Sequence, residues 1–203
     1  MKNGWLVGTF LSVSLLMAST VAAMDAPIDI VRNTTDQVLS RVASDRDALR
    51  QDPAKMFNLV SELIFPHFDF PVMSQLVLGT HWKGAEEGAR TQFIEQFRKL
   101  LVRTYATALL EFSDQKISYP DDNPPAEGRT ALVRQEIEQT GSEPILLGYR
   151  LHNSSGNWKV FDVAVDGVSL VKTYRASFSS IIKDGGIDSL ISSLSSKNAE
   201  IGQ

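Results

Sequence analysis

The chain has 203 residues, 43% of them hydrophobic and 22% charged, and its 20 basic and 24 acidic side chains give a net charge of −4 at neutral pH. A nucleic-acid-binding protein needs a concentrated basic face to neutralise phosphates, so this balance argues against nucleic acid as a partner. The sequence contains no cysteine. We therefore expect neither a disulfide nor the cysteine-linked lipid anchor of a lipoprotein, and stability must come from buried apolar surface.

Residues 1–23 have the three parts of a secretory signal peptide. Lys2 supplies the positive end, residues 5–17 form an apolar run, and Val21, Ala22 and Ala23 provide the small residues of a cleavage site. The run is shorter than the roughly 18 residues of a membrane-spanning helix. We expect cleavage before Met24 and export to the bacterial periplasm. The mature chain, residues 24–203, would lose only Lys2 among its charges, leaving 19 basic and 24 acidic residues and a net charge of −5. That length suits a single domain.

The N-terminal half, residues 27–112, has the periodicity of several helices. An apolar stripe with helical spacing runs from Val31 to Leu49. Asp52 followed by Pro53 is typical of a helix start, and a third short helix ends at Gly79. Residues 89–112 differ, because from Leu100 onward apolar side chains cover nearly the whole circumference. Such a helix must be buried on most sides, either between two layers of protein or between the protein core and an apolar ligand.

The C-terminal half changes to the period of two that marks strands. Three runs alternate in this way, at residues 130–140, 145–153 and 158–165, within a predicted sheet region of 115–165. Short polar turns connect them, so we expect antiparallel hairpins. Two helices follow within residues 168–198, separated at Gly185 and Gly186. The pattern predicts an α+β fold in which helices cover a curved antiparallel β-sheet, with the interface either packed solid or open as an apolar pocket.

Several motifs resemble those of the MlaC family, the periplasmic phospholipid carriers of the maintenance-of-lipid-asymmetry system, also known as toluene-tolerance proteins. The similarity runs from about Pro27 to Leu194. The long loop at 121–128 and the serine-rich tail depart from the family pattern. The motifs are residues 147–151, 158–163 and 166–175, together with Phe68, Asp69, Phe70, Met73, Leu78, Gly79, Trp82, Phe93, Phe97, Leu101 and Tyr105.

The resemblance implies a carrier that encloses the acyl chains of a glycerophospholipid in an apolar pocket between sheet and helices. It implies two partners, an inner-membrane ABC transporter complex and an outer-membrane lipoprotein–porin complex, and we expect a monomer. No cofactor or metal is expected, since the phospholipid is cargo. Each candidate for an acyl-chain contact is also compatible with a place in the plain core. The candidates are Leu101, Tyr105, Leu109, Leu147, Tyr149, Leu151, Val163, Val165, Tyr174 and Phe178.

Basic residues near these positions are candidates for the lipid head group, because a charged head stays wet while the tails are buried. Taken singly, each is better explained as solvated surface charge or as a partner in an ion pair with Asp162 or Asp166. The candidates are Arg103, Arg150, Lys159, Lys172 and Arg175.

Two other classes of function remain open at this point. An enzyme is disfavoured because the three histidines are widely separated and there is neither a cysteine nucleophile nor a Gly-x-Ser-x-Gly elbow. Asp69 or Asp162 beside aromatic residues would be the candidate bases, although helix capping or ion pairing explains them as well. The other alternative is a non-catalytic adaptor that binds only proteins of an envelope transport system, with a solid core.

Overall fold

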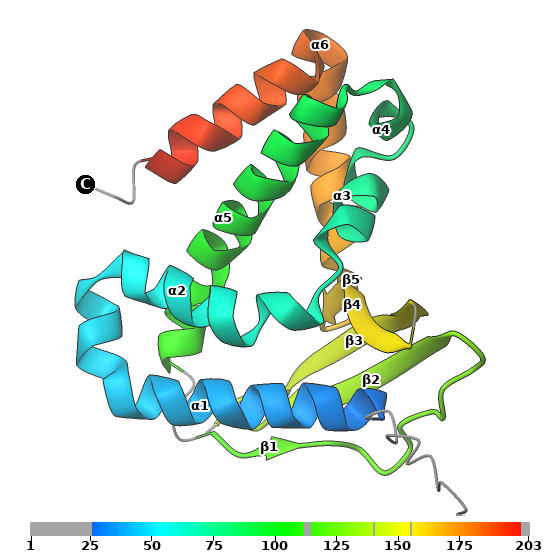
Figure 1. The fold of residues 1–203 in the computed structure, drawn as a ribbon. Helices are drawn as coiled ribbons and strands as arrows, with labels where there is room; N and C mark the ends of the chain where they lie inside the picture. Colours follow the sequence, from blue (N-terminus) through cyan, green and yellow to red (C-terminus); the bar gives the residue numbers. More distant parts are fainter. Residues whose placement is uncertain (1–25, 112–114, 140, 155, 200–203) are drawn as a thin grey trace, which may run out of the picture.

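A computed structural model describes residues 26–111, 115–139, 141–154 and 156–199 (Figure 1). The predicted signal peptide and Phe112, the end of the predicted apolar helix, lie outside the described residues. In the described part, helices precede a five-stranded antiparallel sheet, and a long helix follows it. This arrangement confirms the predicted α+β class.

The N-terminal helices begin and end where local chemistry dictates. Helix α1 spans Pro27–Gln51 and α2 spans Pro53–Leu63, and the Asp52 carboxylate accepts a hydrogen bond from the Ala54 amide at 2.9 Å. A 3₁₀ turn, η1 (Phe65–His67), leads to α3 (Phe70–Leu78). Asp69 caps α3 by accepting from the Val72 amide at 3.0 Å. These carboxylates satisfy amides that the helix itself leaves unpaired.

Gly79 ends α3 with a φ of 57°, in the region that favours glycine. A β-carbon at this position would lie 2.8 Å from the Arg175 guanidinium of the last helix, so a side chain would also collide there. The short α4 (His81–Gly84) and the long α5 (Glu87–Glu111) follow. Gly79 therefore allows α3 to approach the C-terminal helix closely.

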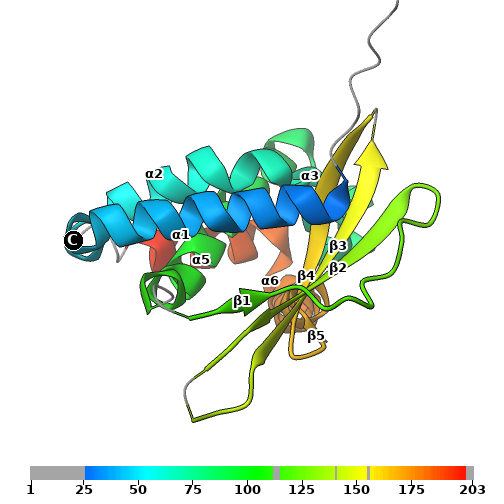
Figure 2. The same ribbon diagram turned by 90° about the horizontal axis from the view of Figure 1, so that it is seen from below.

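The sheet has the strand order β1-β2-β3-β4-β5, every pair being antiparallel. The three expected strands are β2 (Thr130–Ile137), β3 (Ile145–Ser154) and β4 (Asn157–Val165). Two-residue strands flank them, β1 (Ile117–Ser118) and β5 (Val168–Ser169). A bulge between Arg150 and Leu151 shifts the β3–β4 register. Helix α1 lies across one face of the sheet (Figure 2).

The last element, α6 (Leu170–Ala199), consists of two helical arms that meet at a kink at Gly186, which has a non-helical φ of 77° and ψ of 178°. Its start is held by Asp162 of β4, a carboxylate that is 1% exposed. Asp162 accepts from the Val171 amide at 3.1 Å and from the Ser169 hydroxyl at 2.7 Å. The expected division into two C-terminal helices thus falls at Gly186 as predicted, and the first part of α6 is anchored to the sheet.

Buried apolar side chains form three clusters. The first helical cluster joins α3, α5 and α6, and includes Phe70, Phe97 and Phe178. The second helical cluster joins α1, α2 and α5, and the sheet cluster packs α1 against β2, β3 and β4. Phe65 packs against both helical clusters, and Phe68 packs against the first helical cluster and the sheet cluster. The hydrophobic core is therefore divided, with few residues spanning its boundaries.

Candidate functional site

Helix α5 carries the apolar positions that the sequence singled out, but it distributes them over two clusters. Leu101 packs against the first helical cluster, whereas Leu109 packs against the second. Tyr105 lies between them along the helix and is half-buried. Burial, followed by contact with Tyr174 of α6, raises the pKa of the Tyr105 phenol to about 12. The same helix therefore contributes to both sides of the boundary between the helical clusters.

Two of the predicted residues on α6, Tyr174 and Phe178, pack edge-on against aromatic rings of α5. The Tyr174 ring meets Phe97 edge-on with centroids 5.3 Å apart, and it lies 5.5 Å from the Phe178 ring. Phe178 is buried and makes further edge-on contacts with Phe93 and Phe97. Aromatic pairs in these geometries add specificity to apolar burial. Phe178 is thus buried within the first helical cluster, whereas Tyr174 and Tyr105 are only partly buried.

The sheet face under α1 combines apolar residues with a buried polar network. Leu151 and Val163 belong to the sheet cluster, and so does the Tyr149 ring. Gln135, 2% exposed, donates to the Thr35 hydroxyl at 3.0 Å and to the Tyr119 hydroxyl at 2.8 Å, and accepts from the Tyr149 hydroxyl at 2.9 Å. Burial also raises the pKa of the Tyr149 phenol, with Tyr119 adding to the effect. This network fastens the sheet to α1.

Leu147 and Val165 pair directly across β3 and β4, one step beyond the Tyr149–Val163 pair on the same face. Both are half-buried. Among the described residues, Leu147, Val165 and Tyr105 are the predicted contacts that belong to none of the three clusters. The predicted acyl-chain contacts therefore do not form one packed core. They are divided among the three clusters, apart from the three residues that belong to none. Whether they contact acyl chains stays a prediction.

The five basic candidates contact different parts of the fold. Arg103 donates to the Lys197 carbonyl of α6, and Lys159 donates to the Pro66 carbonyl of η1. Arg150 lies 3.4 Å from the Asp162 carboxylate and over the Phe161 ring, and Arg175 packs beside Gly79. Lys172 is exposed in the first turn of α6. These contacts do not converge on one point, and a head-group role for these residues stays a prediction.

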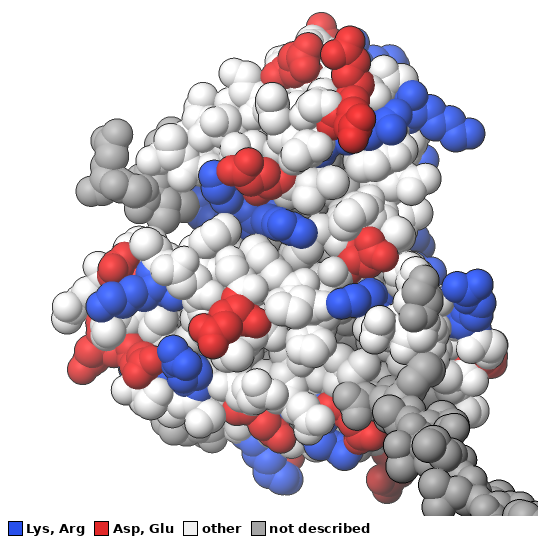
Figure 3. All heavy atoms as spheres, in the orientation of Figure 1, with Lys and Arg blue, Asp and Glu red and all other residues white. Residues whose placement is uncertain are grey.

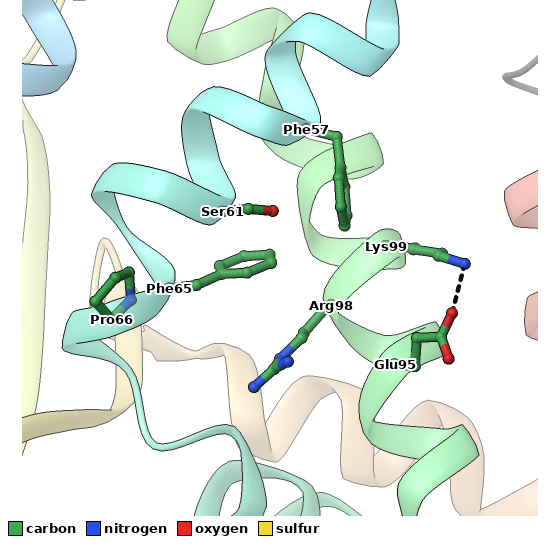
Figure 4. A pocket seen from close by; sticks show the side chains of 7 residues that line it. All are labelled: Phe57, Ser61, Phe65, Pro66, Glu95, Arg98 and Lys99. Atoms are coloured by element: carbon green, nitrogen blue, oxygen red, sulfur yellow. Dashed lines mark hydrogen bonds and ion pairs between the residues drawn. The ribbon is translucent and has the colours of Figure 1, made fainter.

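A groove with a volume of about 540 Å³ opens between α2 and α5 (Figure 4). Phe57, Ser61 and Phe65 reach into it from the α2–η1 side, and Arg98 enters from α5. The Arg98 guanidinium lies 4.6 Å from the centroid of the Phe70 ring and 5.5 Å from that of Phe65. A guanidinium over aromatic faces is stabilised by cation–π attraction.

The sequence does not reveal this groove, because its walls lie on two helices whose pairing is a property of the fold. No local signal in the sequence marks it. Arg98 and Lys99 are charged residues between the apolar positions Phe97 and Leu100 of α5, as on the polar side of any amphipathic helix. Figure 3 shows acidic and basic side chains interspersed over the face of the molecule drawn there.

The carboxylates considered as catalytic bases have structural partners. Asp69 caps α3, and its other oxygen lies 2.9 Å from Nε2 of His152, so it ties the start of α3 to β3. Asp162 caps α6. Within the described residues, no group of three histidine or carboxylate side chains is placed to hold a metal ion. The described helices also include none that is both long and apolar enough to cross a membrane.

The class of protein is indicated by comparison with a solved structure. A phospholipid-binding protein from Ralstonia solanacearum, solved in complex with a phospholipid, superposes with a TM-score of 0.81 and 32% sequence identity. The match covers 88% of this chain and 100% of that one. The fold is therefore that of a phospholipid-binding protein.

Sequence comparisons then identify the family. The sequence pattern of the MlaC protein family matches residues 32–196, and the chain belongs to that family. It is 28% identical to the "Intermembrane phospholipid transport system binding protein MlaC" of Haemophilus influenzae, over 96% of this chain and 92% of that protein. It is 26% identical to the "Toluene tolerance protein ttg2D" of Pseudomonas putida, over 83% and 78% respectively. The resemblance found in the motifs is thus confirmed.

Proposed function

We propose that this chain is a periplasmic phospholipid-binding carrier that moves glycerophospholipid between an inner-membrane ABC transporter complex and an outer-membrane lipoprotein–porin complex, and so maintains outer-membrane lipid asymmetry. The observation that carries the proposal is the similarity to the phospholipid complex from Ralstonia solanacearum, which extends over most of the chain. The names of the two sequence relatives, a phospholipid transport protein and a toluene tolerance protein, support the same function.

The energetics of lipid transfer require a carrier to make many apolar contacts with the acyl chains. Burying one methylene is worth about 0.8 kcal/mol, so a lipid with about 30 of them needs roughly 24 kcal/mol of replacement contacts to leave a bilayer. Only a pocket that envelops both chains supplies this. Transfer between two apolar hosts is then nearly balanced, so the direction of transport comes from partners that bind the loaded and empty carrier differently.

The carrier has no need of catalysis, and the positions of Asp69 and Asp162 as helix caps support a non-catalytic role. We also propose that the protein works as a monomer after removal of residues 1–23. Fractionation of cells tests this placement. We expect the protein in the soluble periplasmic fraction, with Met24 or a near neighbour at its N-terminus. Retention in the membrane fraction after a high-salt wash would contradict it.

Native mass spectrometry of protein purified from the periplasm without detergent tests the carrier function. We expect one bound phospholipid per chain, identified by solvent extraction, and uptake of labelled phospholipid from vesicles by stripped protein. A bare protein that also takes up no lipid would reject the carrier and favour the adaptor that binds only proteins.

A further inference from the structure

The groove between α2 and α5 contains hydrogen-bonding atoms that the protein itself does not satisfy. Among the described residues, neither Nε of Arg98 nor the hydroxyl oxygen of Ser61 has a hydrogen-bond partner, although both atoms are buried. A buried polar group without a partner is costly, the more so when it is charged. Both residues line the same groove. A ligand that accepts hydrogen bonds from both would remove that cost.

The charges of the groove favour an anionic ligand. Its ionised residues are Arg98, Lys99 and Glu95, and Glu95 is paired with Lys99 at 2.7 Å. Figure 4 shows Glu95 and Lys99 joined to each other, with the Arg98 side chain pointing away from this pair. The Arg98 guanidinium is thus the charge not offset within the groove. The aromatic walls, Phe57 and Phe65, favour a ligand that also has an apolar part.

The position of Arg98 along α5 connects the groove to the predicted acyl-chain contacts. Leu101, Tyr105 and Leu109 follow Arg98 at intervals of three, four and four residues, so all four positions lie on one face of the helix. At 1.5 Å per residue, Arg98 and Leu109 are about 16 Å apart along the helix axis. This is close to one half of a bilayer's hydrocarbon thickness, about 15 Å. A lipid with its phosphate at Arg98 would have its chains alongside the other three residues.

The groove also lies over a boundary of the core. Phe65 lines the groove and packs against both helical clusters, and its ring stands edge-on to Phe57 and Phe70, with centroids 5.9 and 4.8 Å away. Ser61 Oγ and Arg98 Nε are covered by neighbouring side chains, so a ligand must displace part of this cover to reach them.

From these observations we infer that the α2–α5 groove is the head-group site of the carrier, in which Arg98 and Ser61 bind the phosphate of a phospholipid whose chains pass inward between the helical clusters. This inference rests on the proposed function. It assigns the phosphate to a residue outside the five basic candidates found from the sequence, and it places Phe65 at the entrance to the chain-binding region.

The test compares two lipids with identical acyl chains, phosphatidylglycerol and diacylglycerol, the second of which lacks the phosphate. In Arg98→Met the long apolar stem remains on the aromatic rings while the charge is lost. We expect its affinity for phosphatidylglycerol, measured by partition from vesicles, to fall ten- to a hundredfold, the usual worth of a charged hydrogen bond. Its affinity for diacylglycerol should stay within twofold of the native value. Ser61→Ala should lower the affinity for phosphatidylglycerol about threefold and leave the affinity for diacylglycerol unchanged.

Arg90→Met is the matched control. Arg90 lies on the same helix, also covers an aromatic ring, that of Trp82 at 5.2 Å, and stands outside the groove. We expect it to bind both lipids as the native protein does. If Arg98→Met does not fold, Arg98→Lys, which keeps the charge but loses Nε, should show a smaller loss confined to the phosphate-bearing lipid.

The outcomes separate the inference from the proposed function. Native protein that binds neither lipid would reject the carrier itself. Native protein that binds phosphatidylglycerol while the groove variants bind it equally well, or lose both lipids to the same extent, would overturn the head-group site alone. Calorimetry with glycerol 3-phosphate distinguishes a soluble phosphate from a lipid. Binding as tight as that of phosphatidylglycerol would overturn the lipid assignment, whereas binding at least a hundredfold weaker supports it.

Discussion

Gln135 illustrates how a single polar residue can organise an apolar interface. Its side-chain amide bridges α1, the segment before β2 and strand β3 through the hydroxyls of Thr35, Tyr119 and Tyr149. Because the amide both donates and accepts, it fixes where each hydroxyl lies. The network therefore sets the orientation of Tyr149, one of the predicted acyl-chain contacts, while keeping its polar end satisfied.

Replacing Gln135 with leucine should destabilise the protein by about 3 kcal/mol, since the change leaves hydroxyls buried without the amide. Urea unfolding measures this through the midpoint at constant slope. Gln37→Leu, on the exposed side of α1, is the control and should change stability by less than about 0.5 kcal/mol. Equal effects of the two substitutions would show that the network contributes little.

Tyr105 provides a spectroscopic probe of the region beside α5. Since the pKa of its phenol is raised to about 12 from 10.0, the folded protein disfavours the tyrosinate. The stability that Tyr105 contributes is therefore complete below about pH 10 and is lost as the pH rises towards 12. In an absorbance titration at the tyrosinate band, Tyr105→Phe should remove part of the late-ionising signal. A loss confined to the early-ionising signal would contradict burial of this phenol.

Charge at the same position tests the acyl-chain contact. Tyr105→Glu places a carboxylate on the α5 face that we expect to line the chains, so bound lipid should be nearly absent while the protein still folds. The matched control is Thr107→Glu, two residues along and exposed. Native mass spectrometry gives the lipid content, and circular dichroism confirms folding. A folded Tyr105→Glu protein with its full complement of lipid would remove this residue from the site.

Among the elements, α6 shows how a glycine divides one helical element into two arms. Gly186 adopts φ 77° and ψ 178°, a backbone region that is almost exclusive to glycine. The two arms pack on the same first helical cluster, Phe178 and Ile182 before the bend and Leu190 and Leu194 after it. The bend thus lets one helix wrap around α5 instead of leaving it.

Gly186→Ala should destabilise the protein by about 1–3 kcal/mol through backbone strain at this angle. Gly88→Ala, in the first turn of α5, should instead be neutral or slightly stabilising. A β-carbon there meets no atom within 4 Å, and alanine lowers the entropy of the unfolded chain. Thermal unfolding of the two variants gives the contrast. A stable Gly186→Ala protein would mean that the bend can be straightened at little cost.

The elements also mark what the sequence could predict. The strands β2, β3 and β4 carry a period of two, and the Asp52–Pro53 start of α2 is a local signal, so both were foreseeable. The two-residue strands β1 and β5 have no period to detect, because their pairing comes from neighbours such as Ile137 and Ala164. The groove at Arg98 was not foreseeable for the same reason, since it exists only where α2 meets α5.

At the scale of the whole molecule, the division of the core matters most. A protein with one continuous core resists the separation of its layers, because every buried side chain packs against many others. Here the boundaries pass through Phe65 and Phe68, each shared by two clusters. We expect the layers to part along these boundaries while the packing inside each cluster is kept, since a carrier has to enclose and release a large apolar cargo.

Hydrogen exchange with and without lipid tests this view of the molecule. A ligand that binds only the native protein slows the openings that expose the amides around it. On loading with phosphatidylglycerol, we expect slower exchange in α2, in α5 from Arg98 to Leu109, and in β3 near Leu147. The short α4, on the far side of Gly79, serves as an internal control and should be unchanged. Uniform slowing across α4 and the rest would instead indicate a general stabilisation, in which the lipid does not act at the cluster boundaries.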